Sequence, residues 1–126
     1  ETIGGRSRKV VGHFARNGFY YSIDRTNGEF LLGGQYVNDL NWTKGLDPKT
    51  GRPIENREAR YDKSGKPSVV VPGPGGAHNW HPMSYSPITR LAYFPVTEAG
   101  FAFIPTAKMK TNTIGWNTGV DFSTPT

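Results

Sequence analysis

Cysteine is absent from this sequence of 126 residues, which excludes disulfides and thiolate metal sites and leaves the compartment undetermined. No apolar run approaches the roughly 20 residues of a membrane-spanning helix. Residues 1–8 are polar and contain glycine, so they show no signal-peptide pattern. Helix signals are also scarce, because proline or glycine occupies several positions that would continue a helix. We therefore expect no helix.

Clustered positive charge is also missing. The formal net charge is +5, but the basic residues are spread along the chain. Nucleic-acid binding needs phosphate contacts that are gathered on one face. We therefore expect a solvated basic surface and no nucleic-acid partner; a single-strand binder that uses exposed aromatic residues is an alternative interpretation.

The sequence does contain short β-forming runs between glycines and prolines. Residues 8–14 and 19–23 are rich in apolar and aromatic side chains, which favours strands. Asn27-Gly28 is a strong hairpin signal, and residues 29–32 resume as a strand that Gly33-Gly34 ends. The first 37 residues are thus predicted to form a three-stranded meander.

The pattern then dissolves over residues 38–82, where we expect a long loop with a turn at 47–51 and one short strand at 69–71. A structureless stretch of this length tends to be functional. Residues 83–126 hold a second hairpin and a tail of weak regularity. The chain is therefore predicted to be all-β, without an internal domain boundary. One meander and one hairpin bury little core alone, so the pattern fits repeated antiparallel blades within something larger.

The segment Gly73–Pro82, with the sequence GPGGAHNWHP, has the character of a ligand loop. Its glycines allow the backbone to approach another group, and its prolines stiffen both ends. Asn79 offers an amide, and Trp80 offers a flat ring with one N–H. An amide beside an indole suits the edge of a planar polar molecule; the alternative is a buried loop anchor.

Other candidate residues have simpler interpretations. His78 and His81 are three residues apart, but no third metal ligand has a suitable spacing, so structural roles are favoured and no metal site is predicted. Asp24 and Asp47 lie at turns, where a carboxylate most often bonds the backbone. Trp42 and Trp116 are candidates for packing or for a pocket wall.

Several stretches together resemble the quinoprotein alcohol dehydrogenases, which are eight-bladed β-propellers that carry pyrroloquinoline quinone. The resemblance rests most specifically on residues 71–84, with VPGPGGAHNWHPMS. It also rests on DRTNGE at 24–29, NGFYY at 17–21, NW at 41–42 with GLDPKTGRPI at 45–54, and GWNT at 115–118. The chain is thereby identified as one blade plus parts of its neighbours.

The resemblance implies that Asn79, Trp80 and Arg16 contact the quinone. A guanidinium at Arg16 can bond the reactive carbonyl oxygen and stabilise charge as the quinone accepts a hydride. Lysine is usual at this position in the alcohol-dehydrogenase branch, and arginine in methanol-dehydrogenase-like members. The chain departs from the blade pattern at Leu32, where a docking tryptophan is usual, and at Arg90, where glycine is usual.

The resemblance also implies what the rest of the enzyme supplies. The catalytic aspartate and the ligands of a calcium or lanthanide ion are expected outside residues 1–126, so this central fragment contributes cofactor-pocket residues and is inactive alone. The whole enzyme is expected to oxidise a primary alcohol in the bacterial periplasm and to pass electrons to a cytochrome c or a quinone. A non-catalytic propeller scaffold is the alternative.

Overall fold

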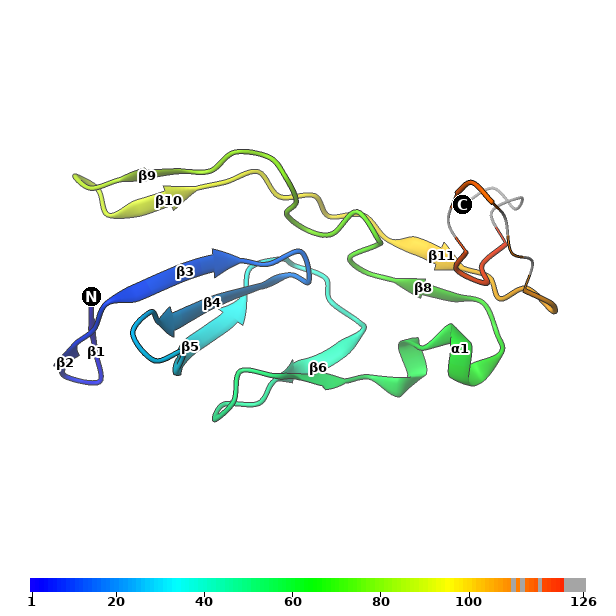
Figure 1. Cartoon of the computed structure of the whole chain (residues 1–126), viewed down its shortest axis with the longest axis horizontal. Helices are drawn as coiled ribbons and strands as arrows, with labels where there is room; N and C mark the ends of the chain where they lie inside the picture. Colours follow the sequence, from blue (N-terminus) through cyan, green and yellow to red (C-terminus); the bar gives the residue numbers. More distant parts are fainter. Residues whose placement is uncertain (110, 112, 116, 122–126) are drawn as a thin grey trace.

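The computed structural model describes residues 1–109, 111, 113–115 and 117–121. The expected all-β class is confirmed, since nearly all regular structure consists of short antiparallel strands (Figure 1). The largest sheet has three strands in the order β3 (Val10–Phe14), β4 (Phe19–Asp24) and β5 (Phe30–Gln35). This is the meander predicted from the sequence.

The connection between β4 and β5 follows from the carboxylate of Asp24. It accepts hydrogen bonds from the Thr26 amide at 2.9 Å and from the Thr26 hydroxyl at 2.5 Å. The backbone closes the turn, because Gly28 N–H donates to the Asp24 carbonyl and Asp24 N–H donates to the Glu29 carbonyl, both at 2.8 Å. Asp24 is therefore a turn residue, as predicted.

β5 does not end at Gly33-Gly34, and that prediction was wrong. The strand runs through both glycines to Gln35, with Gly33 paired with Tyr21 and Gly34 with Tyr20. A Cβ atom at Gly33 would lie 2.8 Å from the carbonyl oxygen of Tyr20 and 3.0 Å from the Leu46 side chain. Glycine is needed at position 33 because Tyr20 and Leu46 pack close to the strand, so Gly33 does not mark the end of the strand.

Residues 38–82 are more regular than expected. β6 (Thr43–Leu46) and β7 (Pro53–Glu55) form a hairpin around the predicted turn, in which the Asp47 carboxylate accepts from the Lys49 and Thr50 amides. A 3-10 turn, η1 (Arg57–Ala59), and one turn of α-helix, α1 (Tyr61–Ser64), follow. The expectation of no helix was therefore wrong. Asn56 caps η1 through the Glu58 amide, and Gly65 ends α1 in the left-handed conformation.

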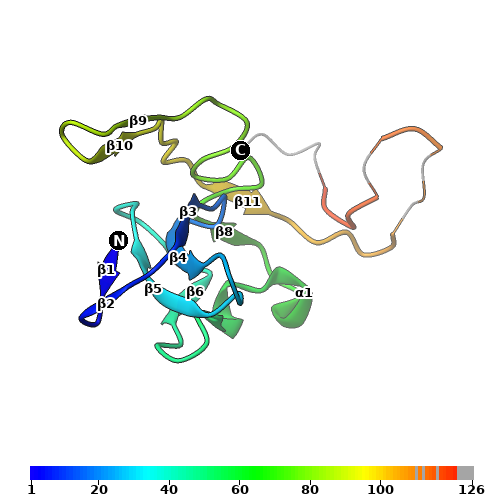
Figure 2. The ribbon, with the colours of Figure 1, turned by 60° about the vertical axis from the view of Figure 1, so that its left-hand side comes forward.

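The second half of the chain supplies two more strand pairs (Figures 1 and 2). β9 (Ser84–Ser86) and β10 (Leu91–Tyr93) form the predicted second hairpin, and β8 (Ser68–Val70) pairs with β11 (Phe101–Phe103). A further small hairpin, β1 (Thr2–Ile3) with β2 (Arg6–Ser7), precedes the meander. Neither β11 nor this first hairpin was predicted, because both consist of very short strands.

The buried core is small. Its apolar members are Phe19, Val37, Ala59, Ala77 and Val120. An aromatic cluster then joins the meander to the second half, with the Phe14 and Phe94 ring centroids 3.8 Å apart. The β9–β10 hairpin leaves Tyr85, Leu91 and Tyr93 more than half exposed. No helix within the described part of the chain is long and apolar enough to cross a membrane.

Candidate functional site

The glycine- and proline-rich loop lies against the end of β3, at Arg16. A Cβ atom at Gly76 would lie 2.8 Å from the Cβ of Arg16 and 3.0 Å from its carbonyl oxygen. Gly76 also has a φ of +78°, which side chains disfavour. The next residue fixes the contact, because Ala77 N–H donates to the Arg16 carbonyl at 2.8 Å and Ala77 is fully buried. The loop and the meander are thus joined through their backbones.

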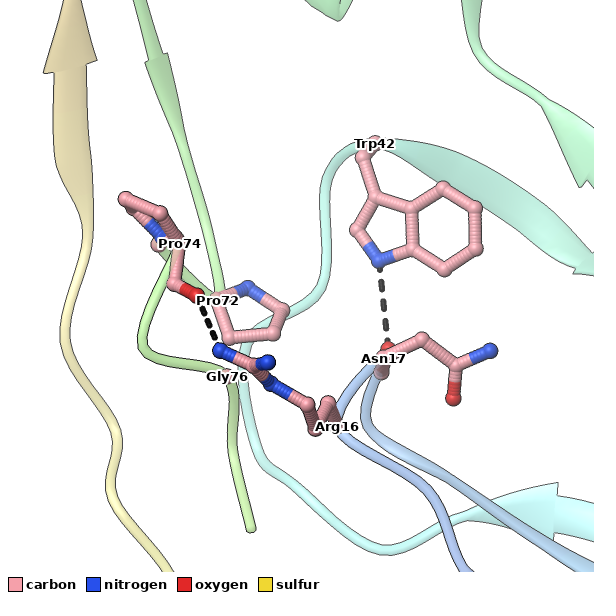
Figure 3. Close-up of a pocket in the computed structure, with 7 residues that line it drawn as sticks. Arg16, Asn17, Trp42, Pro72, Pro74 and Gly76 are labelled. Atoms are coloured by element: carbon pink, nitrogen blue, oxygen red, sulfur yellow. Dashed lines mark hydrogen bonds between the residues drawn. The ribbon is translucent and has the colours of Figure 1, made fainter. Parts of the chain in front are cut away.

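The side chains of Arg16 and Asn79 meet on one carbonyl oxygen. The Nη2 atom of Arg16 donates to the Pro74 carbonyl at 2.7 Å (Figure 3). The same atom reaches the Gly75 carbonyl at 3.4 Å. Asn79 Nδ2 donates to the same Gly75 carbonyl at 3.0 Å. Two residues that are far apart in the sequence, and that were both predicted as site residues, are therefore brought together.

Trp80 presents its indole to solvent. Its side chain stacks on His81, with ring centroids 4.5 Å apart and an interplanar angle of 19°, while the residue remains 80% exposed. The Trp80 indole N–H donates no hydrogen bond to any of the described residues. Trp80 is therefore a surface ring held by one neighbour, unlike the buried anchor of the alternative interpretation.

The three predicted residues border one cavity of about 470 Å³. Its wall contains a guanidinium, an amide, an indole and three imidazoles, and it is completed by apolar side chains: the lining residues are His13, Phe14, Arg16, His78, Asn79, Trp80, His81 and Met83. Carboxylates do not occur in this lining, so the wall is suited to a planar ligand with acceptor or anionic groups. Neither His13 nor Met83 was singled out as a site residue from the sequence: His13 belongs to no recognisable pattern, and Met83 lies in the 71–84 motif but was given no role.

Arg16 also lines a smaller cavity of about 270 Å³ (Figure 3). Asn17, Trp42 and the loop residues Pro72 to Pro74 contribute to its wall. The Trp42 indole donates to the Asn17 carbonyl at 3.2 Å and contacts Phe19 edge-on. Trp42 therefore both packs and lines a pocket; Trp116, the other tryptophan considered with it, lies outside the described residues.

The histidines have the structural roles expected for them. His78 is buried, its Nδ1 atom lies 3.0 Å from the Pro95 carbonyl, and its ring meets Phe94 edge-on. His81 stacks on Trp80. Across the part of the chain that the structure describes, no group of three or more histidine or acidic residues could hold a metal ion.

The two aspartates singled out in the sequence are held in structural contacts at their turns. Hydrogen bonds from Thr26, supported by the Arg8 guanidinium at 3.1 Å, lower the pKa of Asp24 below its ordinary value. The pKa of Asp47 is lowered in the same way by Thr50, first through its hydroxyl and then through its amide. Both groups stabilise turns in the ionised form, so neither is poised as a general base.

No family model matches this chain. The dehydrogenase subunit of alcohol dehydrogenase (quinone) from Komagataeibacter europaeus is 42% identical over 129 residues, a match that covers 96% of this chain and 16% of that subunit. Quinohemoprotein alcohol dehydrogenase ADH-IIG from Pseudomonas putida is 48% identical over 108 residues, covering 83% of this chain and 15% of that protein.

Solved structures that resemble this chain are also of quinohemoprotein alcohol dehydrogenases. The crystal structure of quinohemoprotein alcohol dehydrogenase from Comamonas testosteroni matches with a TM-score of 0.81 at 41% identity, covering 94% of this chain and 18% of that one. The chain therefore spans less than a fifth of the length of the relatives it matches.

Proposed function

We propose that the protein to which this chain belongs oxidises alcohols with bound pyrroloquinoline quinone. The chain is homologous, over nearly its whole length, to one segment of the quinoprotein alcohol dehydrogenases, and it has the fold of a β-propeller segment; both findings support the proposal. Within that protein, residues 1–126 form part of the wall of the quinone pocket. The observation that carries the proposal is the meeting of Arg16 and Asn79 on the Gly75 carbonyl, beside the exposed ring of Trp80.

The donor set fits such a ligand. Pyrroloquinoline quinone is planar, carries carboxylates and carbonyl oxygens, and supplies the hydride-accepting chemistry. Arg16 provides a permanent positive charge, and Asn79 retains one amide hydrogen and its carbonyl oxygen beyond the bond to Gly75. The indole N–H of Trp80 supplies a third donor without breaking any bond to the described residues. The residues present can therefore hold an anionic acceptor at its edge.

The roles of these residues are to bind and to orient. Arg16 would stabilise negative charge on a ligand oxygen, because a guanidinium that is already in place needs no reorganisation when charge develops. Asn79 would fix the orientation of the ligand edge, and Trp80 would restrict solvent at the same edge. The base that removes the alcohol proton would be an aspartate outside these residues, so the chain alone would be inactive.

The wider setting of the enzyme is proposed from its relatives. A calcium or lanthanide ion would be held by ligands outside this chain. The names of two relatives, a 1-butanol dehydrogenase (cytochrome c) and an alcohol dehydrogenase (quinone), support a cytochrome or a quinone as the electron acceptor. By family analogy, we also propose that such an enzyme works in the periplasm.

The proposal is tested on the intact protein, freed of cofactor and titrated with pyrroloquinoline quinone. We expect saturable binding, and alcohol-dependent reduction of a dye once calcium is added. Asn79→Asp should weaken quinone binding at least tenfold, because it replaces an amide donor with a like charge beside an anionic ligand. Asp39→Asn serves as the control, since Asp39 does not line the cavity. An intact protein that binds no quinone would support the scaffold alternative instead.

A further inference from the structure

Arg16 is joined to the loop in three independent ways. Its carbonyl accepts from Ala77 N–H, its guanidinium donates to the Pro74 and Gly75 carbonyls, and its Cα and Cβ atoms lie where a side chain at Gly76 would stand. These contacts use only groups of this chain. They therefore hold before any ligand is bound.

The carbonyls that Arg16 bonds lie outside the turn's own backbone hydrogen bond. Pro74 and Gly75 are both exposed, and the turn's own backbone bond runs from Gly76 N–H to the Gly73 carbonyl at 2.9 Å. Arg16 donates to the Pro74 and Gly75 carbonyls, and Asn79 donates to the Gly75 carbonyl. The guanidinium thus acts as a clamp across the tip of the loop.

We propose that Arg16 is a positioning residue that presets the loop backbone in the cofactor-free protein, separately from any contact it makes to a bound ligand. Asn79 and Trp80 project from the backbone that this clamp fixes. The inference rests on the proposed function, since the ligand positioned by the loop is the quinone. A loop that is already ordered avoids the ordering cost at the moment of binding.

The clamp is specific to the guanidinium. One Arg16 nitrogen carries two hydrogens and reaches two successive carbonyls from a planar, pre-oriented group. A lysine ammonium is a strongly hydrated point charge on a flexible stem, without the fixed planar geometry of the guanidinium, so Arg16→Lys should hold the loop less well than arginine. Arg16→Met keeps the apolar stem and removes every donor.

The test is hydrogen exchange of residues 73–82 in the intact, cofactor-free protein. The amides of Gly76 and Ala77 are suitable reporters, because their acceptors are backbone carbonyls that an Arg16 substitution leaves in place. We expect Arg16→Met to speed their exchange about three- to tenfold, the loss expected for one exposed charged hydrogen bond. Arg16→Lys should give an intermediate rate. Arg25→Met is the control and should leave the exchange rate of both amides unchanged, because Arg25 is exposed and its side chain makes no hydrogen bond to the described residues.

Quinone affinity, measured on the same variants, separates the inference from the proposed function. Faster exchange with weaker quinone binding, both partly restored in Arg16→Lys, is the expected result. Faster exchange with unchanged quinone affinity would support the clamp and contradict the proposed quinone contact of Arg16. Unchanged exchange in both Arg16→Met and Arg16→Lys would overturn the positioning role, whatever the affinity.

Discussion

Gly76 packs directly against the backbone of Arg16, closer than any side chain would allow. A Cβ atom there would lie 2.8 Å from the Arg16 Cβ, at a φ of +78°. The contact explains why the loop needs glycine at this position, since the Ala77 amide reaches the Arg16 carbonyl only if residue 76 has no side chain.

Gly76→Ala should therefore destabilise the intact protein by about 2 kcal/mol or more, from the left-handed backbone and the overlap together. The denaturant midpoint measures the loss, and quinone binding should weaken with it. Gly75→Ala is the matched control, because its Cβ meets nothing within 4 Å and its φ is not in the left-handed region. Equal effects of the two substitutions would show that the close contact is not responsible.

The stack of His81 on Trp80 gives a second prediction. His81→Ala should free the indole and weaken quinone binding about two- to tenfold, the range expected for one aromatic pair. His81→Phe keeps a flat ring and should retain most of the affinity. Tryptophan emission, compared with that of Trp80→Phe, reports whether the indole has moved. If His81→Ala left both the emission and the affinity unchanged, the stack would have no role in holding Trp80.

Glu98 links the segment after β10 to the loop after β5. Its carboxylate accepts from the Asn38 amide N–H at 2.7 Å and from the Asn38 side chain at 2.9 Å, and these bonds lower the pKa of Glu98 below its ordinary 4.5. A depressed folded-state pKa contributes stability above the unfolded-state pKa, and this contribution is lost as the pH falls through the folded-state pKa. Wild type should thus be slightly more stable than Glu98→Gln at neutral pH, and the difference should shrink below about pH 4.

Denaturant midpoints of both proteins across this range measure the effect. Glu58→Gln is a suitable control, because Glu58 is exposed and its carboxylate has no recorded bond. A difference between wild type and Glu98→Gln that stayed constant with pH would argue against the Glu98–Asn38 contact.

Arg90 occupies a position that favours glycine. It has a φ of 59° in the turn between β9 and β10, where its amide donates to the Ser86 carbonyl at 2.7 Å. Arg90→Gly should therefore stabilise the hairpin by about 1 kcal/mol, because it relieves the left-handed backbone. The ion pair that it loses, to Glu1 at 3.9 Å, is exposed and contributes little. Thr89→Gly, at a neighbouring position without a positive φ, should destabilise instead; thermal unfolding distinguishes the two.

The sequence predicted those elements whose signals are local. The meander follows from β-forming runs around Asn27-Gly28, and the Asp47 turn from its own residues. The β8–β11 pair was not predicted, because its strands are three residues each and lie about 30 residues apart, so nothing local indicates their register. The end of β5 was misplaced for a related reason. Gly33 is required by the approach of Tyr20 and Leu46, and a glycine alone does not show whether it breaks a strand or admits a neighbour.

The sequence by itself determined the all-β class, the ligand-loop motif and the candidates Asn79 and Trp80, because each depends on residue type and short-range order; Arg16 was added by the family resemblance of the sequence. Only the tertiary structure decided how those residues relate. It placed the guanidinium of Arg16 on the carbonyls of Pro74 and Gly75, joined Asn79 to the Gly75 carbonyl, and left Trp80 open to solvent. The contacts of Arg16 join residues about 60 positions apart, and they form only when the loop folds back onto the end of β3.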